Sequence, residues 1–129
     1  LPKTWFQKQN NQFLLRDWKH DKPLNVPFHM GCFMFFRNTI LQEVGGFDER
    51  FFMYMEDIDL TRRVHRKAKT LFWPAIIIVH NHQRASYKNR RLLKIHIQSA
   101  IRYFNKWGWL VDKERTKWNQ MVMKEINKQ

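Results

Sequence analysis

The chain has 129 residues, 43% of them apolar and 16% aromatic, which supports one folded domain with a core and excludes a disordered tail. Its formal charge of +13 comes from the second half: residues 1–60 hold seven basic and eight acidic side chains, whereas residues 61–129 hold 17 and three. Such a field attracts nucleic acid, an anionic membrane leaflet or phosphate-bearing substrates equally well.

The longest stretches without a charged side chain have 14 residues each, too few for a transmembrane helix, which needs about 20. The chain starts without a methionine and without the pattern of a signal peptide, so we expect it to begin within a longer protein. Its single cysteine, Cys32, excludes an internal disulfide and favours a reducing compartment, with the cytoplasm as the default.

Residues 1–25 are polar with scattered aromatic side chains and predict a short helix followed by a loop. Residues 26–36 are apolar, and their unbroken run of apolar side chains after Gly31 predicts a strand that is buried on both faces. Asn38 is placed to cap a short helix over residues 39–44, which the Gly45-Gly46 pair would end in a left-handed conformation.

A second helix is predicted from Glu56 onward, because Leu60, Val64 and Ala68 recur at every fourth position. Acidic residues occupy its first turn and arginines follow, an order that complements the helix dipole. Residues 70–80 then predict two short strands around Pro74. The second of these strands, residues 76–79, is predicted to be buried because all four side chains are β-branched.

The pattern becomes helical after Arg84. One face of this predicted helix is apolar and carries Leu93, Ile97, Ala100, Ile101 and Phe104. The segment Trp107-Gly108-Trp109 breaks the pattern, and Asp112 is placed to cap a last helix that is basic on its polar side.

Glu56, Asp57 and Asp59 are the sharpest chemical feature of the sequence, since three carboxylates within four residues repel one another. Repulsion and partial burial raise a carboxyl pKa, while a helix N-terminus lowers it, so one of the three can be tuned to act as a general base. The alternative interpretation is simple charge complementarity with the start of a helix.

Two histidines and a basic segment follow the strand predicted over residues 76–79. His80 and His82 are candidate metal ligands because ligands gather at the carboxyl ends of strands, although this spacing is also typical of structural histidines. Arg84 and Lys88 can hold a diphosphate, or they belong to a solvated loop that leads into the next helix.

Three segments in succession carry a family resemblance: GCFMFFR at 31–37, EVGGFDERFFMYMEDIDLTRR at 43–63, and residues 74–80. Together they resemble the C-terminal half of a bacterial family 2 glycosyltransferase of the rhamnosyltransferase-like subgroup, over about residues 26–91. The resemblance implies an α/β fold. Residues 1–91 would be the acceptor-side part of a GT-A catalytic domain, with short strands and an acidic helix, and residues 92–129 a basic amphipathic helical extension.

The resemblance also implies an activity. Family members transfer a sugar from a nucleotide-sugar donor to a cell-surface polysaccharide or a lipid-diphosphate acceptor, with inversion at the anomeric carbon. The subgroup name points to rhamnose as the sugar. Asp57 would be the general base that deprotonates the acceptor hydroxyl, assisted by Glu56. Gly31 and Asp59 would lie against the acceptor.

A divalent metal, Mg²⁺ or Mn²⁺, is implied as the group that neutralises the leaving diphosphate. His80 matches the metal-proximal histidine of the family, and the spacing leaves His82 as a rival. The nucleotide-binding strands of the family, with their Asp-x-Asp metal motif, normally precede Gly31 by well over a hundred residues, and only 30 residues precede it here. We therefore expect a fragment that is inactive alone.

The basic C-terminal part has a matching interpretation. Trp107, Trp109 and Trp118 lie among lysines and arginines and suit docking on an anionic inner leaflet, which would place the protein in the cytoplasm at the inner face of the cell membrane. The alternative is a domain whose exposed helix faces are merely basic. A non-catalytic remnant and a basic nucleic-acid-binding domain are the competing functions. Nucleic acid is not an expected partner, because it leaves the acidic cluster unexplained and no recognition module is present.

Overall fold

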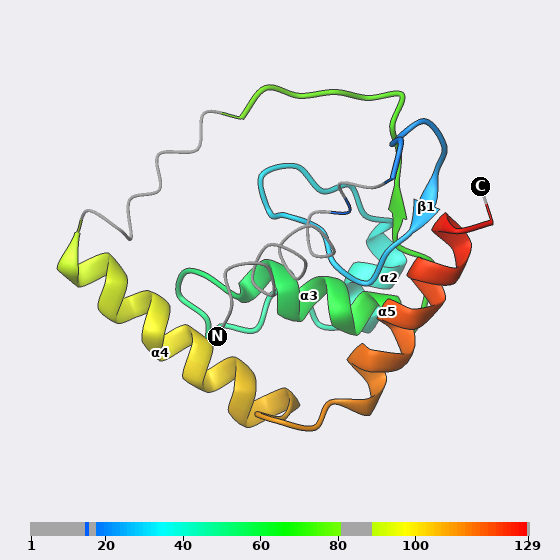
Figure 1. Cartoon of the computed structure of the whole chain (residues 1–129). Helices are drawn as coiled ribbons and strands as arrows, with labels where there is room; N and C mark the ends of the chain where they lie inside the picture. Colours follow the sequence, from blue (N-terminus) through cyan, green and yellow to red (C-terminus); the bar gives the residue numbers. More distant parts are fainter. Residues whose placement is uncertain (1–14, 16–17, 81–88, 129) are drawn as a thin grey trace.

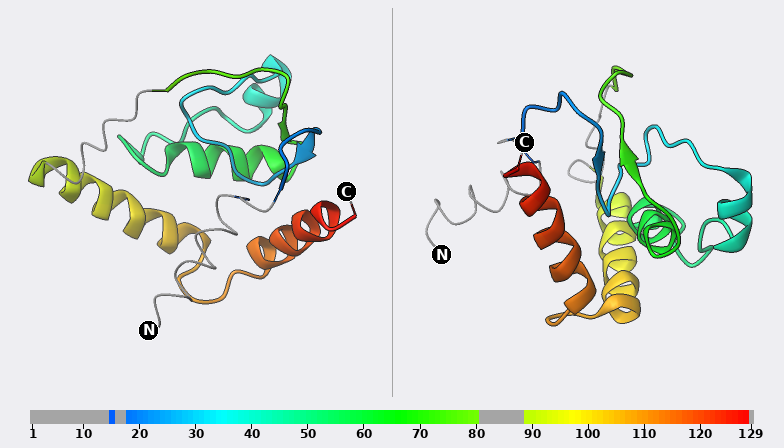
Figure 2. Two further views of the ribbon diagram at one scale, coloured as in Figure 1. Left: turned by 45° about the horizontal axis from the view of Figure 1, so that its top comes forward. Right: turned by 90° about the vertical axis from the view of Figure 1, so that its right-hand side faces the viewer.

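The computed structural model describes residues 15, 18–80 and 89–128 (Figure 1). Six elements follow one another along these residues: β1 (Leu24–Asn25), α2 (Asn38–Glu43), α3 (Glu56–His65), β2 (Leu71–Phe72), α4 (Arg90–Trp107) and α5 (Lys113–Ile126). In the right-hand view of Figure 2, α3 is seen end-on between α4 and α2. None of the helices in the described ranges has the length and apolar character that a transmembrane span requires.

The two strands form one short antiparallel pair, in which Leu24 lies opposite Phe72 and Asn25 opposite Leu71. Thr70 extends the pairing, because its N–H donates to Oδ1 of Asn25 at 2.8 Å and its carbonyl accepts from the Val26 N–H at 2.9 Å. The pair lies over a buried apolar cluster that α5 completes. This cluster consists of Trp18, Leu24, Val26 and Val122, with Leu15, Phe72 and Ile126 packed against it.

Helix α2 is present, and its predicted end is confirmed: Gly45 and Gly46 have φ of 76° and 66°, a left-handed conformation that favours glycine. The predicted cap is wrong. The helix begins at Asn38 itself, so Arg37 occupies the N-cap position, and no side chain caps the helix there.

Helix α3 is confirmed with its predicted charge order. Glu56, Asp57 and Asp59 lie in its first turn, and basic side chains lie in its last turn. Leu60 and Val64 are buried, as their spacing predicted. One face of this helix is therefore buried in the core, and the segment that follows β1 contacts its acidic first turn.

The buried strands predicted within residues 26–36 and over residues 76–79 are wrong. Residues 26–36 contain no strand, and Phe35 within them is exposed. Of the two strands predicted around Pro74, the first exists as β2, but residues 76–79 form no strand and Val79 is 99% exposed. β-Branched composition indicates a preference for burial. Burial also needs a covering partner, and no strand of the described residues pairs with either segment.

Helices α4 and α5 are confirmed, and so is the cap of α5, since Oδ1 of Asp112 accepts the Arg115 N–H at 2.9 Å. The apolar face predicted for α4 does not point into the core. The buried residues of α4 are Ser99 and Tyr103, whereas Leu93, Ile97 and Ile101 are exposed. The helix predicted near the N-terminus falls outside the described residues.

Candidate functional site

Asp57 and Gly31, which the sequence singled out separately, are in direct contact. The Gly31 N–H donates to Oδ2 of Asp57 at 2.8 Å, and the Ile58 N–H donates to Oδ1 at 2.8 Å. One N–H on each oxygen fixes the orientation of the carboxylate, and each oxygen keeps a lone pair for a further donor. Because Asp57 is only partly buried, a ligand can reach it.

The contact explains why residue 31 is a glycine. A Cβ at Gly31 would lie 3.0 Å from the Cβ and 3.3 Å from Oδ2 of Asp57, closer than side-chain atoms normally approach. Its backbone does not have positive φ, so close approach and not conformational freedom is the requirement here. The loop that follows β1 is thereby held against the first turn of α3.

The segment that leads into α3 adopts an unusual backbone conformation. Tyr54 and Met55 both have φ of 66°, in the left-handed region that non-glycine residues avoid. Such residues persist where the surroundings fix them. Here the Tyr54 ring stacks on His96 of α4 with ring centroids 4.6 Å apart, and Oγ of Ser99 donates to the Met53 carbonyl at 2.7 Å. Helix α4 thus helps to aim the acidic turn.

Glu56 is electrostatically perturbed. Its burial raises the pKa of the carboxyl group and the negative charge of Asp57 raises it further, while a hydrogen bond with its own backbone opposes the shift. Its Oε2 is buried and has no hydrogen-bond partner among the described residues. The turn therefore places a carboxyl group that binds a proton readily beside the hydrogen-bonded carboxylate of Asp57.

Asp59 has a structural role in place of the acceptor contact that we predicted. It is fully buried and accepts from three side chains on two helices. Its Oδ2 accepts from Nε of Arg63 at 2.8 Å, and its Oδ1 accepts from Nε1 of Trp107 at 2.8 Å and Nζ of Lys106 at 2.6 Å. A side chain with no exposed surface and three donors fastens α3 to α4 and offers nothing to a ligand.

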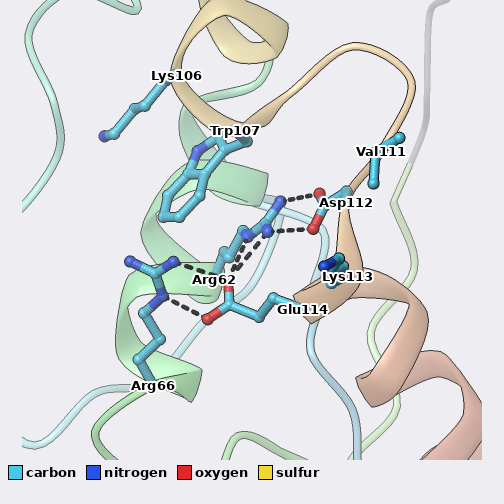
Figure 3. Close-up of a pocket in the computed structure, with 8 residues that line it drawn as sticks. All are labelled: Arg62, Arg66, Lys106, Trp107, Val111, Asp112, Lys113 and Glu114. Carbon is cyan, nitrogen blue, oxygen red and sulfur yellow. Dashed lines mark hydrogen bonds and ion pairs between the residues drawn. The ribbon is translucent and has the colours of Figure 1, made fainter.

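A second connection, which the sequence analysis missed, fixes the other end of α3. Nη1 and Nη2 of buried Arg62 donate to Asp112 at 2.6 and 2.7 Å, and Arg62 also reaches Glu114 (Figure 3). The guanidinium lies 4.1 Å from the ring centroid of Trp107. Burial alone would lower the pKa of Arg62, but its hydrogen bonds, first of all with Asp112, raise the pKa well above its usual range.

The same carboxylate of Asp112 that binds Arg62 also caps α5. Sequence reasoning found the cap because it is local. It could not find the partner, which lies 50 residues away. A hollow of about 380 Å³ opens beside this network, and it is lined by Arg62, Arg66, Lys106, Trp107, Val111, Asp112, Lys113 and Glu114 (Figure 3). It belongs to the C-terminal half of α3 and not to the turn that carries Asp57.

The remaining site residues predicted from sequence are less well placed. His80 ends the exposed segment after β2, and His82, Arg84 and Lys88 lie outside the described residues. Within the ranges that the structure describes, no group of three or more His, Cys, Asp or Glu side chains could hold a metal ion. The metal and diphosphate contacts therefore stay predictions.

Comparison with known proteins gives partial matches. A stretch of 52 residues is 38% identical to an N-acetylglucosaminyl-diphospho-decaprenol L-rhamnosyltransferase of Mycobacterium tuberculosis, covering 40% of this chain and 17% of that protein. A stretch of 81 residues is 36% identical to rhamnosyltransferase WbbL of Escherichia coli K12, covering 60% of this chain and 30% of that protein. Part of the chain is similar to rhamnosyltransferases.

The chain spans less than a third of the length of these curated relatives. No family model matches it, and no solved structure gives a significant match. At a coarse level, the similarity supports glycosyltransferase activity.

Proposed function

We propose that the chain is the acceptor-side part of an inverting glycosyltransferase of the GT-A type, in which Asp57 is the general base. The contact between Asp57 and Gly31 carries the proposal, because it holds a partly exposed carboxylate in one orientation. The partial similarity to rhamnosyltransferases supports it from an independent direction.

In the proposed reaction, Asp57 accepts the proton of an acceptor hydroxyl as that oxygen attacks the anomeric carbon of the donor sugar. The bond from this carbon to the diphosphate oxygen breaks, and the nucleoside diphosphate leaves with the electron pair. Attack from the opposite face inverts the configuration. Such a displacement has oxocarbenium character, which an adjacent negative charge stabilises. Glu56 lies beside Asp57 in the same turn, and the negative charge of Asp57 is one cause of its raised pKa.

The substrates are proposed from the printed names of the relatives. These proteins are rhamnosyltransferases, and one of them is named for an N-acetylglucosaminyl-diphospho-decaprenol substrate. We accordingly propose a nucleotide-sugar donor, with rhamnose as the first sugar to test, and a lipid-diphosphate-linked glycan as acceptor. The site of action would be the inner face of the cell membrane.

A divalent metal is part of the proposal, but the described residues do not supply a complete ligand set for it. Asp57, which receives one backbone N–H on each oxygen, is kept for the base role in this proposal. His80 and His82 are the candidate metal contacts of this chain, and Arg84 and Lys88 the candidate diphosphate contacts. The metal would neutralise the diphosphate.

The decisive experiment replaces Asp57 with Asn in the longest natural protein that contains this chain, because the 129-residue chain is expected to be inactive alone. Removing a general base lowers turnover by about 10²–10⁴-fold. Glu49→Gln is the matched control, since Glu49 is an exposed acid outside α3, and it should leave turnover unchanged. Full turnover in Asp57→Asn would reject the proposed base. Absence of transfer by the unmodified protein with every nucleotide sugar would favour the non-catalytic remnant.

A further inference from the structure

Helix α4 carries an apolar stripe that the rest of the described structure leaves uncovered. Leu93, Ile97 and Ile101 are exposed and lie four residues apart, so they form a line along the helix axis. Phe104 continues the line and packs against the tilted ring of Trp109 in the linker between α4 and α5, with ring centroids 5.2 Å apart. The stripe thus runs from the helix into the linker without a break.

The linker ends this stripe in a projecting apolar tip at residues 109–111, which we call the wedge. Leu110 is 92% exposed and Val111 is 73% exposed. The indole of Trp109 is held in place, because its Nε1 donates to Oδ1 of Asn105 at 2.8 Å. The turn before the wedge depends on Gly108, whose φ is 107° and where a Cβ would lie 2.9 Å from the Val111 carbonyl oxygen. The wedge is therefore a shaped feature of the fold.

Positive charge surrounds the wedge. Residues 89–128 contain ten basic side chains against three acidic ones, and two of the acids, Asp112 and Glu114, form ion pairs with Arg62 or Arg66. Lys113 and Lys117 are exposed beside the wedge and share with Leu110 and Val111 the lining of a hollow of about 340 Å³. The apolar side chains of the wedge match the apolar interior of a lipid leaflet, and the lysines beside them match its anionic surface.

We propose that the wedge and the stripe of α4 dock this chain on an anionic lipid bilayer, with the wedge inserted at the boundary between headgroups and acyl chains. A nucleic acid fits this surface less well, because most of its exposed side chains, such as Leu110 and Val111, are aliphatic and give bases no ring to stack on. A second copy of the chain fits less well too, since two surfaces of the same positive charge repel each other. The inference concerns a surface separate from Asp57 and does not require the transfer reaction.

Of the three tryptophans predicted to dock on the membrane, the structure leaves one available for docking. Trp107 and Trp118 are committed to internal contacts: the indole of Trp107 donates to Asp59 and stacks with Arg62, and the ring of Trp118 lies edge-on to His65. Trp109 is left as the tryptophan of the docking surface. Lys106 is likewise committed to Asp48 and Asp59, so a charge change there would disturb the fold and not test docking.

The test is co-sedimentation of the 129-residue chain with vesicles made of equal parts of phosphatidylglycerol and phosphatidylcholine. We expect the wedge variant Trp109→Ser/Leu110→Ser/Val111→Ser to bind at least tenfold more weakly than the unmodified chain. The matched control is Ile77→Ser/Val79→Ser, which removes equally exposed apolar side chains from another part of the surface and should bind normally. Circular dichroism of each variant verifies that it is folded.

Charge is tested in the same way. Lys113→Glu/Lys117→Glu should weaken binding at least tenfold, whereas Lys19→Glu/Lys22→Glu, an exposed pair with the same change in net charge, should have a smaller effect. Asp57→Asn should bind vesicles as the unmodified chain does, so that docking and catalysis can fail separately. Normal vesicle binding by the folded wedge variant would overturn the proposal. The proposal would also be overturned if the unmodified chain formed a dimer and the wedge variant did not. Binding of the unmodified chain to single-stranded oligonucleotides but not to vesicles would overturn it as well.

Discussion

Replacing Arg62 with methionine is expected to be the most destabilising single change at the junction of α3, α4 and α5. Methionine keeps an unbranched apolar side chain against Trp107, so the change isolates the charge. It leaves Asp112 buried, with only 4% of its side chain exposed and without its two short hydrogen bonds. Arg115 cannot replace Arg62, because its Nε is 4.0 Å from Asp112 and its own side chain is half exposed.

The magnitude follows from this burial. Breaking a buried ion pair by removing one partner costs about 3–5 kcal/mol, because the remaining charge stays desolvated. Glu114 keeps its ion pair with Arg66 at 2.7 Å in this variant, so it loses less stabilising interaction than Asp112 does. We therefore expect Arg62→Met to lower the free energy of unfolding by about 3 kcal/mol, measured by urea unfolding of the 129-residue chain with circular dichroism. Arg66→Met, at a half-exposed site, is the control and should cost less than about 1 kcal/mol.

A second change tests the cause. Asp112→Asn removes the charge but keeps an oxygen that can cap α5. Adding it to Arg62→Met should recover about 1–2 kcal/mol, since the stranded charge is gone. A loss below about 1 kcal/mol in Arg62→Met, or a double variant less stable than Arg62→Met, would refute the reasoning that an uncompensated buried charge dominates.

Three further outcomes follow from the site. Gly31→Ala should lower turnover at least about tenfold, because its Cβ would meet Asp57 at 3.0 Å and displace the carboxylate; full turnover would contradict this. Glu56→Gln should raise the free energy of unfolding by up to about 1 kcal/mol at pH 7 and not at pH 4, because a raised pKa means that the ionised form destabilises the fold above that pKa; thermal melts at both pH values check this, and an equal gain at both would contradict it. Burial lowers the pKa of both His29 and His65, so the unfolded chain binds protons first and the free energy of unfolding should fall as the pH drops below 6.5; urea unfolding from pH 7.5 to 5.5 tests this, and a flat profile would argue against it.

Most local signals in the sequence predicted local features correctly, and the cap assigned to Asn38 of α2 is the exception. The charge order and spacing of α3, the glycine end of α2 and the cap of α5 each depend on neighbours within about four residues, and each is present. The failed strand at residues 76–79 has a different cause. Its β-branched side chains favour burial, but burial requires another segment of the chain to cover them, and a local pattern does not predict that segment.

The candidate site shows the same division. Asp57 and Asp59 are two residues apart on a helix and so point to nearly opposite faces. The sequence contained a signal for the role of Asp59, because Arg63 lies one helical turn further on, at a spacing that allows an ion pair, and Leu60 beside it is a core residue. The structure contains this ion pair, at 2.8 Å. The contact between Asp57 and Gly31, across 26 residues, needed coordinates.

The double use of Asp112 has a geometric consequence for any substrate that arrives in a membrane. This residue directly follows the wedge and is bound to Arg62, which lies five residues after Asp57 on α3, about 7 Å along the helix axis. The depth at which the wedge inserts would then set a constant height of Asp57 above the lipid. Acceptors would be selected by reach: a glycan too short or too long between its diphosphate and the attacking hydroxyl would miss the carboxylate, whatever its sugar.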